Sequence, residues 1–166
     1  MDIIAEDIAD RADLRKTLRA FIYRTGMLTT KAVDPEAQTV YTMYYDYSEP
    51  VNKIAGHRVL AINRGEREDC LKVSINIQTD AAIHMIENEL VTGENASADY
   101  VKLCCADSFT RLIFPSLERE IRNMLFENAS EAAIKVFSLN LRQLLLQPPV
   151  KGTVTLGLDP AYRTGC

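Results

Sequence analysis

The chain has 166 residues, with 19 lysines and arginines against 23 acidic residues and a formal charge of −4. This length suits one domain, or one domain plus a fragment, whose core is large enough to need no disulfide or metal. Apolar residues make up 47% and charged residues 25%, as in ordinary soluble globular proteins, which argues against disorder and fibres. No apolar run has the roughly 18–20 residues of a membrane span, and the acidic N-terminus does not resemble a signal peptide.

The N-terminal half of the sequence predicts several short helices and one clear strand. Leu14, Leu18 and Ile22 recur at helical spacing, with Asp10 and Asp13 as a capping pair before them and Gly26 as a stop after them. Strict alternation predicts a strand at 70–77. The other expectations are helices at 2–9, 11–25, 57–64 (ended by Gly65) and 79–90, an extended segment at 27–33, a helix rather than a strand at 35–46, and a short helix from Glu49-Pro50.

The C-terminal half predicts a helix that ends near residue 113 and a second, long helix at about 115–146. The break is expected because Pro115 disfavours α conformation at Phe114. Past Pro115 the apolar residues keep one three-four spacing until Pro148-Pro149. Residues 153–158 read as a strand with almost nothing after it. Either it pairs with the strand at 70–77 or the chain is a piece cut from a longer protein, and we favour the cut piece. We therefore predict a mainly α fold: a multi-helix domain over 1–150 with one long helix in its C-terminal half and one or two short β-strands.

Neither a metal nor a cofactor is expected. The cysteines are Cys70, Cys104, Cys105 and Cys166, without a C-x-x-C pair, and the histidines His57 and His84 stand alone. Zinc sites need several ligands at turn-compatible spacing. Cys104 and Cys105 fall in an apolar helical pattern, where free thiols behave as small hydrophobes. Free thiols favour a reducing, cytoplasmic location.

The most basic stretch is 11–31, where six cations stand against Asp13 alone, a local excess of +5 (six minus one). Such a stretch is either a solvated helix face or a phosphate-contacting surface, and both interpretations stay open. Phe21 shares the apolar face and is expected in the core. The candidate nucleic-acid-binding residues are Arg11, Arg15, Lys16, Arg19, Arg24, Arg58 and Arg64.

The sequence contains no catalytic constellation. His57 opens a short helix without a nucleophile at a recognisable spacing, and the glycines form no phosphate-binding loop. The tyrosines Tyr41, Tyr44, Tyr45 and Tyr47 are expected to pack against a core rather than stack on bases. Asp159-Pro160 is an ordinary turn signal. We expect no catalytic residue and no enzyme activity.

Three segments resemble the Tex family of transcription accessory proteins. The first runs from His57 to Glu66 and is similar to the family's "S-H-R-x-L-A-x-x-R-G-E" stretch. The second runs from Ala132 to Pro149 and the third from Leu156 to Cys166. Order and spacing also fit, so the resemblance covers nearly the whole chain. The chain departs from the family at Ala55-Gly56, where Pro-Ser is usual, and at Ala161, where Gly often follows Asp-Pro.

This resemblance implies the central helical part of a longer protein, with 151–166 as the start of a YqgF (RNase H-like) domain. Tex proteins also carry helix-hairpin-helix units and an OB-fold RNA-binding domain. The resemblance implies a nucleic-acid-binding protein that meets RNA or DNA through the whole polypeptide. The unbroken apolar register of the long helix and the lack of a catalytic constellation lead to the hypothesis that this region is a non-catalytic scaffold. Two alternatives remain: a docking module for RNA polymerase or associated factors, and part of a RuvC-like nuclease with Asp159 as its first carboxylate.

Overall fold

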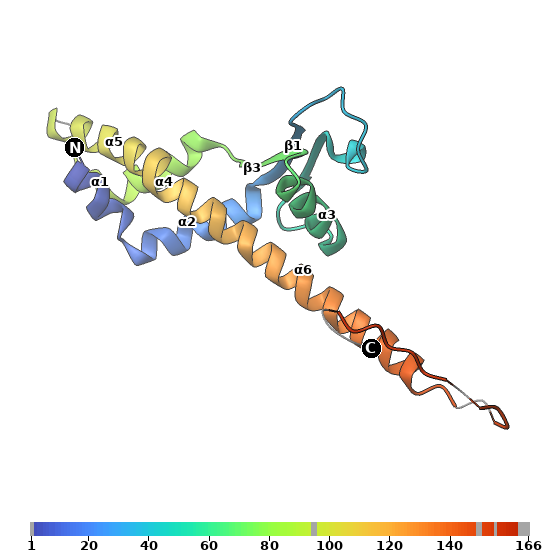
Figure 1. Ribbon diagram of the computed structural model, residues 1–166. Helices are drawn as coiled ribbons and strands as arrows, with labels where there is room; N and C mark the ends of the chain where they lie inside the picture. The colour runs from blue at the N-terminus through green and yellow to red at the C-terminus, as the bar shows by residue number, and fades with distance from the viewer. Residues whose placement is uncertain (1, 94–95, 149–150, 155, 163–166) are drawn as a thin grey trace. The chain divides into compact units, whose positions relative to one another are not determined.

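The computed structural model describes residues 2–93, 96–148, 151–154 and 156–162 (Figure 1). The chain divides into two compact units, Met1–Ile134 and Lys135–Cys166. The elements are α1 (Asp2–Ala9), α2 (Ala12–Thr25), β1 (Met27–Ala32), the 3-10 turn η1 (Thr42–Tyr44), β2 (Asp46–Pro50), α3 (Gly56–Arg67), β3 (Leu71–Asn76), α4 (Thr79–Leu90), α5 (Ala96–Asp107), the π-helical segment η2 (Ser108–Ile113) and α6 (Phe114–Leu145). The predicted mainly α fold class is confirmed.

A small antiparallel sheet forms in the order β2-β1-β3, one strand more than predicted. Leu28 and Ile75 are opposite each other on its buried face, and Thr30, also buried, donates to the carbonyl of Tyr44. The predicted helices at 35–46 and from Glu49-Pro50 are wrong. Residues 42–44 form only the 3-10 turn η1, and β2 begins at Asp46 and pairs with β1 as an edge strand. Pro50 is the last residue of this edge strand, where proline is tolerated.

The tyrosines of this region pack inward, as expected. Tyr41 and Tyr44 are buried, and the Tyr44 ring meets the Tyr47 ring edge-on at a centroid distance of 5.5 Å. Tyr45 donates a hydrogen bond to the carbonyl of Ala37 at 2.6 Å, which holds the loop before η1. These rings therefore form part of the core under the sheet rather than a surface for stacking bases.

Two predicted helix boundaries differ from the structure. The N-cap of α2 is Arg11, without a side-chain cap bond, so the Asp10 and Asp13 capping pair is wrong. Gly65 does not end α3, which continues to Arg67. A Cβ at Gly65 would lie 2.7 Å from Leu71 Cδ1, so glycine here serves close packing of α3 on β3. Gly26 does end α2, as predicted, and its N–H donates to the Ile22 carbonyl.

The helix does not break at Pro115, contrary to the prediction. α5, η2 and α6 follow one another from Ala96 to Leu145, and Figure 1 shows α5 leading into α6 as one helix. Phe114 keeps helical angles, φ −62° and ψ −47°. In a regular α-helix the ring of Pro115 would clash with the preceding turn, and its missing N–H would leave a carbonyl without its hydrogen bond. The wider π turns before Pro115 accommodate both features.

The core of unit 1 joins the helices to the sheet. Phe109, Ile113, Leu117 and Ile121 are fully buried along η2 and the start of α6. They belong to one apolar cluster with Leu14, Leu18 and Ile22 of α2 and with Leu28, Leu71 and Ile75 of the sheet. The first half of α6 is thereby fixed to unit 1 through its own side chains.

The second half of α6 is different. The long helix predicted at 115–146 is confirmed, but in the described part of the chain no α6 side chain after Ala129 is buried. Of the strand predicted at 153–158, the described residues Thr153, Val154 and 156–158 have no strand structure, and Thr155 lies outside the described residues. None of the described helices is long and apolar enough to cross a membrane.

Candidate nucleic-acid interface

Two of the predicted cations join α2 to α6. Arg15 Nη2 donates to Ser116 Oγ at 2.7 Å, and its Nη1 donates to the Ala9 carbonyl at 3.3 Å. Arg19 Nη2 donates to Glu120 Oε2 at 3.0 Å. These guanidinium groups hold the helices of unit 1 together, so Arg15 and Arg19 of the basic stretch 11–31 are used for intramolecular contacts.

Arg58 is the centre of a polar cluster between α3 and β2. Its Nη1 lies 2.9 Å and 3.0 Å from the two carboxylate oxygens of Glu49 and 3.0 Å from the Tyr47 hydroxyl, which also donates to Glu49. The hydrogen bond from Tyr47, followed by those from Arg58, lowers the pKa of Glu49 despite partial burial. Arg58 is therefore neutralised within the protein.

Arg11, another of the predicted cations, has a longer contact, 3.9 Å to Glu89.

Three of the seven predicted cations are exposed, and the described contacts include no hydrogen bond or ion pair for their side chains: Lys16, Arg24 and Arg64. Lys16 and Arg24 stand about two turns apart on α2 and line one shallow hollow of about 630 Å³. Thr17 and Ala20 lie between them, and Asp13, Phe21 and Met85 line the same hollow, so it holds one carboxylate beside its two cations. Phe21, expected in the core, is only half-buried.

The sheet brings together a second cationic pair that sequence reasoning did not select. Lys31 of β1 stands directly opposite Lys72 of β3, and both are exposed. Asp46 of β2 is the neighbour of Lys31 on the other side. Like charges directly opposite each other destabilise a sheet, and Asp46 in the same row offsets part of this repulsion. The strand alternation around Lys72 was visible in the sequence, but its pairing with β1 was not.

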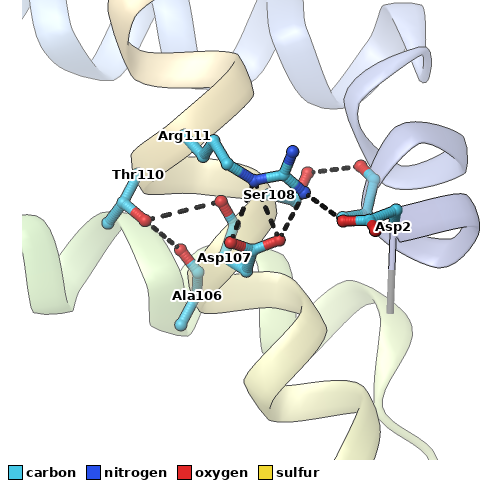
Figure 2. A network of polar contacts seen from close by, with 7 residues as sticks. Asp2, Ala106, Asp107, Ser108, Thr110 and Arg111 are labelled. Atoms are coloured by element: carbon cyan, nitrogen blue, oxygen red, sulfur yellow. Dashed lines mark hydrogen bonds and ion pairs between the residues drawn. The ribbon is translucent and has the colours of Figure 1, made fainter.

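Arg111 forms a separate network that joins α1 to η2 (Figure 2). Its Nη2 lies 2.7 Å from Asp107 Oδ2 and 2.9 Å from Asp2 Oδ1, and the hydrogen bonds from Arg111 lower the pKa of Asp107. Ser108, fully buried, donates to the Ala5 carbonyl at 2.7 Å. These groups satisfy one another, so the network is an anchor between helices.

The side chains considered for catalysis or metal binding, His57, His84 and Asp159, are each exposed. His57 lies exposed at the start of α3, while Asp159 lies exposed in the second unit. His84 contacts Glu87 at 2.8 Å. Within the described ranges, no group of three His, Cys, Asp or Glu side chains could hold a metal ion.

Residues 1–137 match the sequence model of the family described as Tex central region-like. The chain belongs to the Tex family. It is 46% identical over 168 residues to the uncharacterized protein YdcI of Bacillus subtilis, covering 99% of this chain and 23% of that relative. It is 30% identical to protein tex of Bordetella pertussis, again over 99% of this chain and 23% of the relative. S1 RNA-binding domain-containing protein 1 of Homo sapiens is 35% identical over 84% of this chain and 15% of its own length.

The resemblance to Tex proteins predicted from the sequence is thus confirmed. Relatives in this family carry the names transcriptional accessory protein Tex, in Neisseria gonorrhoeae, and S1 RNA-binding domain-containing protein 1. The chain spans less than a quarter of the length of these relatives, 23% and 15%. Most of the relatives' length therefore lies outside the region that this Tex chain matches.

Proposed function

We propose that this chain is a non-catalytic helical scaffold within a nucleic-acid-binding transcription accessory protein of the Tex family. Unit 1 would provide a folded base, and the second half of α6 would carry other parts of the polypeptide. The family names motivate the transcriptional role and the nucleic-acid partner. In this role the protein would act in the cytoplasm, and its protein partners would be RNA polymerase or associated factors.

One observation carries the scaffold proposal: the exposed apolar surface of α6. Leu144 and Leu145 are 61% and 73% exposed, and Ile134, Val136, Phe137, Leu139 and Leu146 are each more than half exposed. Apolar patches of this kind mark surfaces that another polypeptide covers. A helix that is apolar on several sides is typical of the interior of a larger protein.

The nucleic-acid contacts proposed for this region are narrower than the seven candidates. Arg11, Arg15, Arg19 and Arg58 contact groups within the protein, so Lys16, Arg24 and Arg64 are the members of that set left for phosphates. Residues 153–158 remain proposed as the first strand of a YqgF domain, which would need partner strands from additional polypeptide.

The nucleic-acid part is tested by fluorescence anisotropy of the 166-residue chain with labelled single-stranded RNA and duplex DNA at about 50 and 200 mM salt. We expect weak binding that falls with salt and is lost in the K16E/R24E double variant. The K53E/R119E variant makes the same charge change at exposed residues outside the hollow and should bind like the wild type. Equal loss in both variants would reject the assignment to Lys16 and Arg24.

A protein-docking module for the transcription machinery is the second candidate, because the same apolar surface of α6 favours it. Polymerase capture that persists in K16E/R24E and is lost in Leu144→Glu would favour docking over nucleic-acid contact. A RuvC-like nuclease role would require that a longer protein lose cleavage activity on Asp159→Asn.

A further inference from the structure

The last three turns of α6 combine apolar side chains with charge of one sign. Phe137, Leu144 and Leu145 are 66%, 61% and 73% exposed. From residue 132 to residue 148 the charged residues are Lys135 and Arg142, both cationic. This surface therefore calls for an apolar partner with carboxylates beside its apolar contacts.

A hollow on this helix has the arrangement that receives a side chain from another helix. It measures about 470 Å³ and is lined by Ser138, Leu141, Arg142, Leu145 and Leu146. The first four stand at positions i, i+3, i+4 and i+7. In knobs-into-holes packing, four residues of one helix surround each inserted side chain of the facing helix in this way. The small Ser138 leaves the space, and the leucines Leu141, Leu145 and Leu146 line it.

We propose that this hollow receives an apolar side chain of an amphipathic α-helix whose flanking residues are acidic and pair with Arg142 and Lys135. The inference rests on the proposed scaffold function, because the helix would come from additional polypeptide of the kind that the relatives carry. The relatives that match 98% or 99% of this chain devote only 23% of their length to the match, so they have ample chain from which to supply it.

A second copy of this helix fits the hollow less well. Pairing two copies through the same face brings Lys135 and Arg142 of one helix beside those of the other. Like charges along a helix–helix seam disfavour association, and this is how coiled coils reject wrong partners. Nucleic acid also fits poorly, because leucine side chains line most of the hollow and offer no stacking surface.

The experiment titrates the 166-residue chain into two labelled helical peptides of about 21 residues, three heptads with Leu at a and d. One peptide carries Glu at e and g, the other Lys. We expect the Glu peptide to bind at least about tenfold more tightly, and Arg142→Glu to reverse this preference. Equal affinity for the two peptides, or an unchanged preference in Arg142→Glu, would overturn the charge assignment.

The hollow itself is tested by filling it. Ser138→Phe should abolish binding of the Glu peptide, while Asn140→Phe, which adds the same ring on the opposite side of the helix, should leave it intact. Both residues are exposed, so neither change should affect the folding of unit 1, as checked by its thermal midpoint. Equal binding by the two variants would overturn the proposal.

The source of the helix is tested with the part of the Bacillus subtilis relative that lies outside the matched region. Added in trans, it should displace the Glu peptide from the wild-type chain and fail to bind Ser138→Phe. Peptide binding without displacement would overturn the assigned source. If the chain binds no peptide but self-associates, and Ser138→Phe abolishes this self-association, the occupant of the hollow is a second copy of the chain and the proposal is overturned. Nucleic-acid binding, which tests the proposed function, is measured separately through K16E/R24E and does not depend on these outcomes.

Discussion

Phe114 donates its backbone N–H to the carbonyl of Phe109, five residues earlier, and Pro115 follows immediately. This wider turn lets a proline stand inside a helix that continues to Leu145. The two rings also contact each other, with centroids 5.7 Å apart. The π segment thus joins the buried helices of unit 1 to α6 without a loop, and a continuous helix is what the scaffold account needs.

Replacing this proline tests how the helix tolerates it. Pro115→Ala introduces an N–H donor and a residue of high helix propensity, which stabilises the helix. It also makes the unfolded chain less rigid, which offsets part of that gain, so the free energy of unfolding should rise by about 1–2 kcal/mol. Urea denaturation followed by circular dichroism measures this. A loss of stability would mean that Pro115 itself holds the π segment in place.

The two halves of α6 should respond differently to truncation of a large side chain. Ile121 is fully buried, so Ile121→Ala should lower the free energy of unfolding by about 2–5 kcal/mol. Phe137 is 66% exposed, so Phe137→Ala should change it by no more than about 0.5 kcal/mol. Urea midpoints of both variants provide the comparison. Similar losses would show that both halves of α6 are equally packed.

Glu118 protects the edge of the sheet. Its Oε1 accepts a hydrogen bond from the Ile75 N–H at 2.7 Å. Glu118→Ala leaves that donor unpaired on an edge strand, so stability should fall by about 1–3 kcal/mol and exchange of the Ile75 amide should accelerate. Glu127→Ala, at an exposed position on the same helix, is the control. Unchanged exchange at Ile75 would remove this role from Glu118.

The Tyr47–Glu49–Arg58 cluster predicts a specific acid sensitivity. The hydrogen bond from Tyr47 and those from Arg58 hold the pKa of Glu49 below its ordinary 4.5 in the folded protein. The ionised Glu49 therefore contributes fully to the free energy of unfolding above pH 4.5, and this contribution is lost as pH falls through the lower folded pKa. The stability difference between the wild type and Glu49→Gln should stay constant from neutral pH to about 5 and shrink below 4.5. A difference independent of pH would contradict the assignment.

Local sequence signals predicted the elements that depend on neighbouring residues. The apolar spacing of Leu14, Leu18 and Ile22 predicted α2, and the alternation around Val73 predicted β3. The strand β2 was missed because its stability comes from pairing with β1, which no local pattern reveals. The effect of Pro115 was also mispredicted, since a π turn depends on buried contacts around Phe109.

The candidate interface also depends on long-range contacts that no local sequence pattern reveals. Sequence spacing placed cations on α2, but it could not show that Arg15 reaches Ser116 or that Arg19 reaches Glu120, each 101 residues away. Charge alone therefore overestimated the number of arginines available to phosphates. The hollow at Ser138 could be read from the i, i+3, i+4, i+7 spacing only once the exposure of α6 was known.

The most direct test of the scaffold account is hydrogen–deuterium exchange of the segment matching Val136–Leu145. It should be measured in this chain and in the full-length Bacillus subtilis relative. We expect fast exchange in this chain, because the exposed half of α6 lacks tertiary support, and strong protection in the longer protein, where other polypeptide covers it. Equally fast exchange in both proteins would contradict the claim that this apolar helix is a scaffold for other domains.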